Sequence, residues 1–235
     1  MKTFLHLTNT QELSLPAQFQ DQDVRYTAAL VEHFLTELSR PGDHVLDPFM
    51  GFGTTLLVCE KLDRVGFGIE FEEKRCSYVK SLLKHPERAL HGDSTKLSGL
   101  DLPDFELSIT SPPYMGKHHL ENPFTAYSTN FSPCPHTGKT GYEQYLDSIQ
   151  DIYRQVAERL KPGGHAVIEV ANLKHEEGIT TLAWDIAGAV GRVLPFAGEV
   201  IVNWQRPESP ELADSRGHSY GYGYDHSYCL LFKKA

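Results

Sequence analysis

The chain has 235 residues, 40% hydrophobic and 23% charged, a balance typical of one globular domain that buries its own core. Its net charge of −9 argues against a broad basic surface for nucleic acid, although charge screening still permits a local basic cleft. The four cysteines lack zinc-site or disulfide spacing, and no apolar stretch has the length of a membrane span, so we expect reduced thiols in a soluble cytoplasmic protein.

Strands and helices are expected to alternate along most of the chain. The first element is an amphipathic helix over residues 24–39, which ends before Pro41. The expected strands are residues 44–49, 64–70, 88–94, 105–111, 165–173, 198–204 and 227–234. The other expected helices are residues 54–62, 72–85, 142–160 and 181–194. Because parallel strands need helical crossovers, these seven strands predict a mainly parallel α/β sheet with helices on both faces.

The domain organisation follows from this order of elements. Residues 1–235 are expected to form a single domain, with a helical lead-in over about residues 1–40. Residues 115–141 and 206–225 fit no element, and both exceed the usual loop length. Loops of that length in a compact domain are usually functional or disordered, so we expect both to be substrate loops.

A glycine-rich turn follows the first expected strand, in the stretch VLDPFMGFGTT. Gly51 and Gly53 allow a tight turn and a close backbone approach to a ligand before Thr54 and Thr55 open a helix. Such a turn is typical of a nucleotide-binding site. The dinucleotide pattern G-x-G-x-x-G fails at Leu56, which disfavours a nicotinamide oxidoreductase. A tight turn that only packs is the structural alternative.

Three acidic residues follow the first three strands of the expected sheet. The first strand carries Asp47, and Glu70 ends the second strand 23 residues later, close to the spacing at which an acid meets ribose hydroxyls. Asp93 follows the third strand and is expected at the same carboxyl edge, where open α/β sheets bind ligands. Its alternative role is a turn or a helix cap.

Together, DPFMGFGTT, the two later acids and SPPY after the fourth strand resemble the S-adenosylmethionine-dependent amino-methyltransferases of nucleic-acid bases, the N4-cytosine and N6-adenine family. The resemblance covers residues 24–234 and implies a Rossmann-like class I methyltransferase fold. It implies that Asp47 and the two glycines line the methionine end of the cofactor, that Glu70 binds the ribose, and that Asp93 contacts the adenine amino group. The wider cofactor set that it implies adds Pro48, Phe49, Thr54, Thr55 and Ser94.

The reaction site implied by the resemblance is the stretch Ser111 to Tyr114, here called the proline corner. An exocyclic amine is a poor nucleophile because its lone pair is delocalised into the ring. The Ser111 hydroxyl and the Pro112 carbonyl could accept its two hydrogens and favour a pyramidal nitrogen. Proline restricts its own backbone and that of the preceding residue, so Ser111, Pro112 and Pro113 are expected to be pre-organised. Tyr114 offers a face for a base taken out of its stack.

Other roles for this stretch remain open. A proline pair also ends an edge strand, with the tyrosine as an aromatic plug. Within the resembling family, serine at the first position is commonest in enzymes acting on cytosine, which predicts N4 methylation of cytosine in DNA. The alternatives are the same reaction on RNA, methylation of adenine N6 in DNA, and a non-catalytic cofactor-binding protein. The Cys134 thiol in SPCP offers covalent catalysis as a minor alternative.

We expect the two long segments to make the substrate contacts, because we expect no separate target-recognition region within these 235 residues. Their basic and aromatic side chains could meet phosphates or stack on bases, and solvated loops are the structural alternative. The predicted substrate-binding residues are Lys117, His118, His119, Arg206, Arg216 and Tyr222. Short recognition surfaces also make a homodimer plausible. The 12 histidines show no metal-binding spacing, and the reaction needs no metal.

Overall fold

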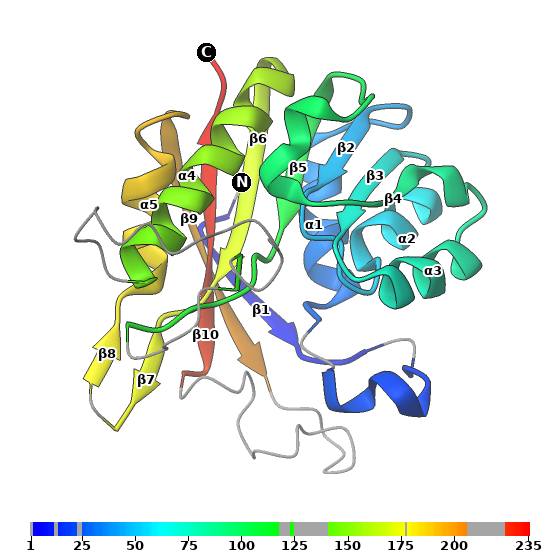
Figure 1. Cartoon of the computed structure of the whole chain (residues 1–235). Coiled ribbons are helices and arrows are strands. Elements are labelled where there is room, and N and C mark those ends of the chain that lie inside the picture. Colours follow the sequence, from blue (N-terminus) through cyan, green and yellow to red (C-terminus); the bar gives the residue numbers. More distant parts are fainter. Residues whose placement is uncertain are drawn as a thin grey trace.

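A computed structural model describes residues 2–11, 14–22, 25–117, 123–124, 141–176, 178–205 and 224–235 (Figure 1). Its strands are β1 (Phe4–Thr8), β2 (His44–Asp47), β3 (Val65–Glu70), β4 (Ala89–His91), β5 (Phe105–Thr110), β6 (Leu160–Val170), β7 (Leu173–His175), β8 (Gly178–Thr180), β9 (Phe196–Gln205) and β10 (His226–Lys233). Eight of them form one sheet in the order β1-β9-β10-β6-β5-β2-β3-β4, and β7 pairs with β8. Strand β10 runs antiparallel to both neighbours, and the other pairings of the large sheet are parallel. The predicted mainly parallel sheet is therefore confirmed.

Two expectations about the strands were wrong. The large sheet has eight strands, not seven, and the additional strand β1 lies inside the segment expected to be a helical lead-in. Strand β1 pairs in parallel with β9, with Phe4 opposite Ile201 and Thr8 opposite Gln205. Leu5 and Leu7 face the core while Phe4 and His6 are exposed, so only two apolar side chains mark the buried face. That pattern is too short to indicate a strand without its partner nearly 200 residues away.

The five predicted helices are confirmed, with ends shifted by a few residues. They are α1 (Ala28–Leu38), α2 (Thr54–Lys61), α3 (Glu73–Leu82), α4 (Gly141–Arg159) and α5 (Leu182–Val190). Short 3-10 helices are η1 (Ala17–Gln22), η2 (Pro86–Arg88) and η3 (Ser94–Gly99). Figure 1 shows α4 and α5 on one side of the sheet and α1 to α3 on the other. Both faces are thus covered, as expected for crossover connections.

The longest helix is also the most amphipathic. The buried face of α4 carries Tyr145, Ile149, Ile152, Tyr153 and Val156, spaced at three or four residues. These side chains join the core between α4, α5 and the sheet. Helix α4 therefore packs its aromatic residues against the strands whose carboxyl ends carry the predicted site.

The carboxyl ends of β2, β3, β4 and β5 meet at one edge of the sheet because these four strands are parallel neighbours. Asp47, Glu70 and Thr110 are the last residues of β2, β3 and β5. The glycine turn, the acids and the proline corner are therefore brought to one edge, where open α/β sheets bind ligands. In the described part of the chain, no helix combines the length and apolarity needed to cross a bilayer.

Candidate active site

The glycine turn joins β2 to α2 in a left-handed conformation. The φ angles of Gly51 and Gly53 are 54° and 79°, a region that side chains disfavour. Gly53 is the N-cap of α2, which begins at Thr54 as predicted. A Cβ atom added at Gly53 would lie 2.5 Å from Cγ1 of Val79 on α3, whereas one added at Gly51 would meet only the Phe49 carbonyl oxygen, at 3.9 Å. The turn therefore needs glycine at position 53 both for its conformation and for packing against α3.

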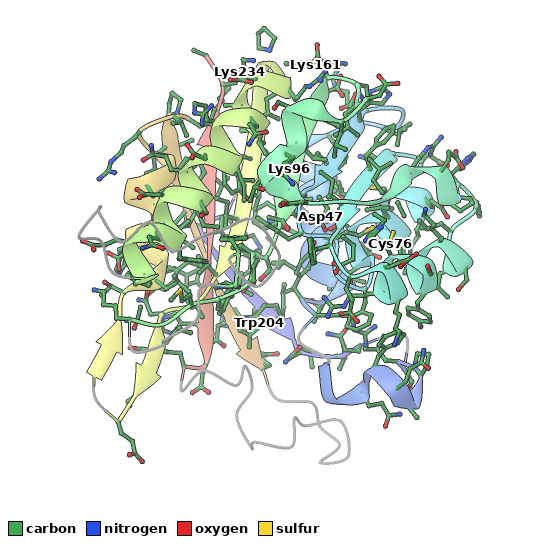
Figure 2. The ribbon with its side chains drawn as sticks, viewed as in Figure 1. Asp47, Cys76, Lys96, Lys161, Trp204 and Lys234 are labelled. Atoms are coloured by element: carbon green, nitrogen blue, oxygen red, sulfur yellow. The ribbon has the colours of Figure 1, made fainter. Side chains whose placement is uncertain are left out.

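Asp47 is a buried carboxylate around which the turn is built, and Figure 2 shows it inside the molecule. Its Oδ1 accepts hydrogen bonds from the Phe49 N–H at 3.0 Å and the Thr110 hydroxyl at 2.6 Å. Its Oδ2 accepts from the Thr55 hydroxyl at 2.6 Å and the Tyr26 hydroxyl at 3.0 Å. Asp47 thus connects the glycine turn to β5, α2 and the segment before α1. The predicted contact of Asp47 with the cofactor stays a prediction, since these bonds show a role in holding the turn.

Two partners of this carboxylate were missed in the sequence. Tyr26 lies just before α1 and also hydrogen-bonds Thr55, and burial is the main cause that raises the pKa of its hydroxyl well above the ordinary value. Thr110 is the last residue of β5, directly before the proline corner. Neither position has a local pattern that predicts a carboxylate partner, because both contacts depend on chain packing. Of these two residues, Thr110 is the more important for the site, because it links Asp47 and the glycine turn to the proline corner.

The pH dependence of stability should report on Asp47. Burial raises the pKa of this carboxyl above its ordinary value, although four hydrogen bonds oppose the shift. The folded protein therefore binds this proton at a higher pH than the unfolded chain, and the contribution of Asp47 to stability rises as the pH falls through the folded-state pKa. We expect the difference in unfolding free energy between the wild type and Asp47→Asn to grow as the pH is lowered from 7. Urea denaturation of both proteins over that range tests this, and a constant difference would contradict it.

Glu70 joins the end of β3 to the glycine turn and is only 7% exposed. Its Oε2 accepts from the Gly51 N–H at 3.0 Å, and its Oε1 accepts from the Glu72 N–H at 2.9 Å and lies 3.3 Å from Nη1 of Arg75. Burial is the largest influence on the Glu70 pKa and raises it, while Arg75 and the backbone donors lower it. A carboxylate oxygen can accept two hydrogen bonds, so Oε2 retains capacity for one hydroxyl beside the turn.

Asp93 and Ser94 lie at the same edge, where η3 begins. Asp93 caps η3, because its Oδ1 accepts from the Thr95 N–H at 2.9 Å and the Thr95 hydroxyl at 2.7 Å. The Ser94 hydroxyl donates to the Pro48 carbonyl and so ties η3 to the glycine turn. The helix-cap alternative for Asp93 is thus realised, and its contact with an adenine amino group stays a prediction.

The proline corner is anchored at both of its ends. Before it, the Thr110 hydroxyl is bound to Asp47. At its far end the Pro113 carbonyl accepts from the Tyr145 hydroxyl at 3.0 Å, and the Tyr114 hydroxyl donates to Glu169 Oε2 at 3.1 Å and accepts from the Ala171 N–H at 3.0 Å. Tyr145 and Glu169 were also missed in the sequence analysis, because α4 and β6 approach the corner only in the folded chain.

The middle of the corner, by contrast, is not hydrogen-bonded within the described part of the chain. The Ser111 hydroxyl and the Pro112 carbonyl make no hydrogen bond to any residue that the structure describes. Ser111 is half-buried and Pro112 is buried. These are the same two acceptors that the sequence predicts for an amino group.

Of the predicted substrate residues, Lys117 lies within the described chain. Its ammonium is 3.6 Å from Asp185 Oδ2 and 5.7 Å from the centre of the Tyr142 ring, and its backbone N–H donates to the Thr180 hydroxyl. A phosphate would compete with Asp185 for this cation. His118, His119, Arg206, Arg216, Tyr222 and the alternative nucleophile Cys134 lie outside the described residues.

The other reactive side chains do not suggest a second site. Cys59, Cys76 and Cys229 are free and buried, and burial raises the pKa of each thiol. Such thiols are poor nucleophiles at neutral pH. Across the described ranges, no three His, Cys, Asp or Glu side chains are grouped so that they could hold a metal ion.

Comparison with known proteins supports the resemblance to DNA amino-methyltransferases independently of the site geometry. Residues 7–81 match the model of a family described as DNA methylase. Type II methyltransferase M.HpaI of Haemophilus parainfluenzae is 42% identical over 129 residues, which cover 53% of this chain and 36% of that protein. Type II methyltransferase M.SmaI of Serratia marcescens is 57% identical over 42 residues, which cover 18% of this chain and 14% of that protein. The matched parts thus span little more than a third of these relatives at most.

The fold is shared with solved methyltransferase structures. TrmN from Thermus thermophilus superposes with a TM-score of 0.59 at 18% sequence identity, covering 93% of this chain and 52% of that one. This likeness shows the class I methyltransferase fold. The DNA methylase match over residues 7–81 and the two relatives support the resemblance of this chain to the N4/N6 amino-methyltransferases, whose cofactor is S-adenosylmethionine.

Proposed function

We propose that this chain transfers a methyl group from S-adenosylmethionine to the exocyclic amino nitrogen of a nucleic-acid base, with N4 of cytosine in DNA as its substrate. The observation that carries the proposal is the division within the proline corner. Its outer polar groups, on Pro113 and Tyr114, are hydrogen-bonded to the protein, while the inner acceptors on Ser111 and Pro112 make no hydrogen bond within the described part of the chain. Thr110 and Asp47 join this corner directly to the glycine turn.

The residues at the sheet edge fit this cofactor by their chemistry. The N-terminus of α2, reached through Gly53, favours a negative group such as the cofactor's carboxylate. Glu70 Oε2 retains capacity for a ribose hydroxyl beside the Gly51 backbone. Asp93 lies one strand further along the same edge, and its carboxylate could accept a hydrogen bond from the cofactor's adenine amino group, as the resemblance implies.

The corner's own groups account for the activation of the amine. S-adenosylmethionine supplies a methyl group on a positively charged sulfur. The Ser111 hydroxyl and the Pro112 carbonyl accept hydrogen bonds from the two amino hydrogens, which favours a pyramidal nitrogen with an available lone pair. The methylated nitrogen releases one proton, which passes to water. Because Thr110 is anchored on one side and Pro113 on the other, these acceptors need little reorganisation during the reaction.

Two features support cytosine in DNA as the substrate. Serine stands at position 111, where the resembling family commonly has aspartate or asparagine in enzymes acting on adenine. The family match is described as DNA methylase, and both relatives are named Type II methyltransferases. Methylation of RNA and of adenine N6 are the outcomes against which this choice is tested.

Nucleoside mass spectrometry tests the proposal directly. The purified protein is incubated separately with DNA and with RNA, each with isotope-labelled S-adenosylmethionine, and the digested nucleosides are analysed. We expect label in N4-methylcytosine from DNA. Label in N6-methyladenine or only in RNA would correct the substrate but keep the amino-methylation. Cofactor binding without label in any nucleoside, over varied DNA sequences, would overturn the proposed activity of this chain.

A further inference from the structure

Two buried groups from outside the motif hold the far end of the proline corner. One is the Tyr145 hydroxyl on α4, which donates to the Pro113 carbonyl. The other is the Glu169 carboxylate near the end of β6, which accepts from the Tyr114 hydroxyl. Both side chains are buried, at 0% and 1% exposed respectively, so each of these hydrogen bonds is shielded from competing water.

The Tyr145 hydroxyl is aimed by the packing of its ring. The ring stacks on Phe124 with centroids 5.5 Å apart and an angle of 11°, and on Tyr142 with centroids 6.1 Å apart and an angle of 22°. Burial raises the pKa of the hydroxyl, so it stays a neutral donor. The ring centroids of Phe124 and Phe49, which lies in the glycine turn, are 5.9 Å apart. The Tyr145 ring therefore belongs to a row of aromatic rings that extends toward the glycine turn.

The Tyr114 hydroxyl is held from two directions. It donates to Glu169 at 3.1 Å and accepts from the Ala171 N–H at 3.0 Å, so its hydrogen and a lone pair are both used. Both partners belong to the end of β6 and the residue that follows it, on a strand adjacent to β5. The position of Tyr114 is thereby tied to the sheet.

These contacts leave Ser111 and Pro112 as a short span between fixed points. Thr110 is fixed to Asp47 before the span, and Pro113 and Tyr114 are fixed after it. We propose that Tyr145 and Glu169 are positioning residues, which orient the Ser111 hydroxyl and the Pro112 carbonyl toward the amino group without touching it. This inference rests on the proposed function for its effect on catalysis, whereas its effect on the corner can be measured without substrate.

The test uses Tyr145→Phe with a matched control on the same helix. The variant keeps the stacked ring and removes only the hydroxyl. The control is Tyr153→Phe, because Tyr153 is equally buried on α4 and its hydroxyl has no hydrogen-bond partner in the described structure. Three quantities are measured on each protein: amide hydrogen exchange in the peptide spanning the corner, affinity for S-adenosylmethionine by calorimetry, and the single-turnover rate of methyl transfer.

We expect Tyr145→Phe to raise exchange in the corner about fivefold, as the loss of one buried hydrogen bond predicts. Methyl transfer should slow by about tenfold or more, because small displacements of reacting groups have large effects on rate. Cofactor affinity should stay within about twofold of the wild type, since the turn itself is unchanged. Tyr153→Phe should match the wild type in all three measurements.

Glu169 is tested by a double-mutant cycle with Tyr114. Glu169→Gln should weaken the bond to Tyr114 and raise exchange in the corner, whereas in a Tyr114→Phe background it should have little further effect. Equal effects of Glu169→Gln in both backgrounds would show that Glu169 does not act through Tyr114.

The outcomes separate this inference from the proposed function. If amide hydrogen exchange in the corner peptide is the same in Tyr145→Phe and Tyr153→Phe, the inference is overturned, whatever the rate of methyl transfer. If the corner loosens but methyl transfer keeps its rate, the positioning role is overturned. A wild-type protein that methylates no nucleic acid refutes the proposed function and with it the catalytic role, while the exchange comparison still decides whether Tyr145 holds the corner.

Discussion

Replacing Ser111 with alanine is expected to slow methyl transfer by about a hundredfold or more while leaving the affinity for S-adenosylmethionine unchanged. A pre-organised polar group at a reaction centre typically has an effect of this size. The Ser111 hydroxyl makes no hydrogen bond to the described residues, so its removal breaks no hydrogen bond within that part of the chain. Loss of rate with retained cofactor affinity and thermal stability would therefore identify a role in the reaction itself.

Ser108→Ala is the matched control for this substitution. Ser108 lies on β5, three residues before Ser111, is 1% exposed, and its hydroxyl has no partner in the described structure. We expect its variant to keep the wild-type rate. Single-turnover kinetics and calorimetry on both variants make the comparison, and an unchanged rate for Ser111→Ala would remove Ser111 from the reaction.

The second large effect is expected for Gly53→Val, which should abolish measurable binding of S-adenosylmethionine and destabilise the fold by about 4 kcal/mol. The left-handed backbone at 79° alone disfavours a side chain by about 1–3 kcal/mol. Overpacking typically adds about 1–3 kcal/mol, and here the new Cβ atom would lie 2.5 Å from Val79. The turn and α3 would have to separate, which displaces the start of α2.

Gly42→Val separates these two causes. Gly42 has a similar φ of 86°, but an added Cβ atom would have no neighbour within 4 Å. We expect a smaller loss of stability, about 1–3 kcal/mol, and wild-type cofactor affinity. Urea denaturation and calorimetry measure both quantities.

A milder variant keeps the test decisive if Gly53→Val does not fold. Gly51→Ala shares the left-handed conformation but brings its Cβ atom no closer than 3.9 Å to a neighbour, and it should weaken cofactor binding with little change in packing. Wild-type cofactor affinity in the Gly51 and Gly53 variants would refute the proposed binding role of the turn.

Local patterns in the sequence determined most of the elements and their order. Helix α4 was predictable because its buried residues recur at three or four positions, and β5 because a short apolar run precedes two prolines. The glycine turn was predictable because backbone conformation depends mainly on the residue itself and its neighbours, and Gly51 and Gly53 do adopt left-handed angles. The carboxyl edge followed from chain order, since parallel strands bring their ends together.

The tertiary structure decided the features that depend on contacts between residues far apart in the sequence. Strand β1 exists as a strand because β9 pairs with it, and its own sequence has too few buried residues to indicate that. Tyr26 and Thr110 reach Asp47 from positions 21 and 63 residues away, and Tyr145 reaches Pro113 across 32 residues. Hydrogen bonds of this kind leave no periodic signal, because one side chain meets one group only after the core has packed. The sequence therefore placed Ser111 to Tyr114 directly after a strand at the carboxyl edge, and the packing determined which of these groups are hydrogen-bonded within the described residues and which are not.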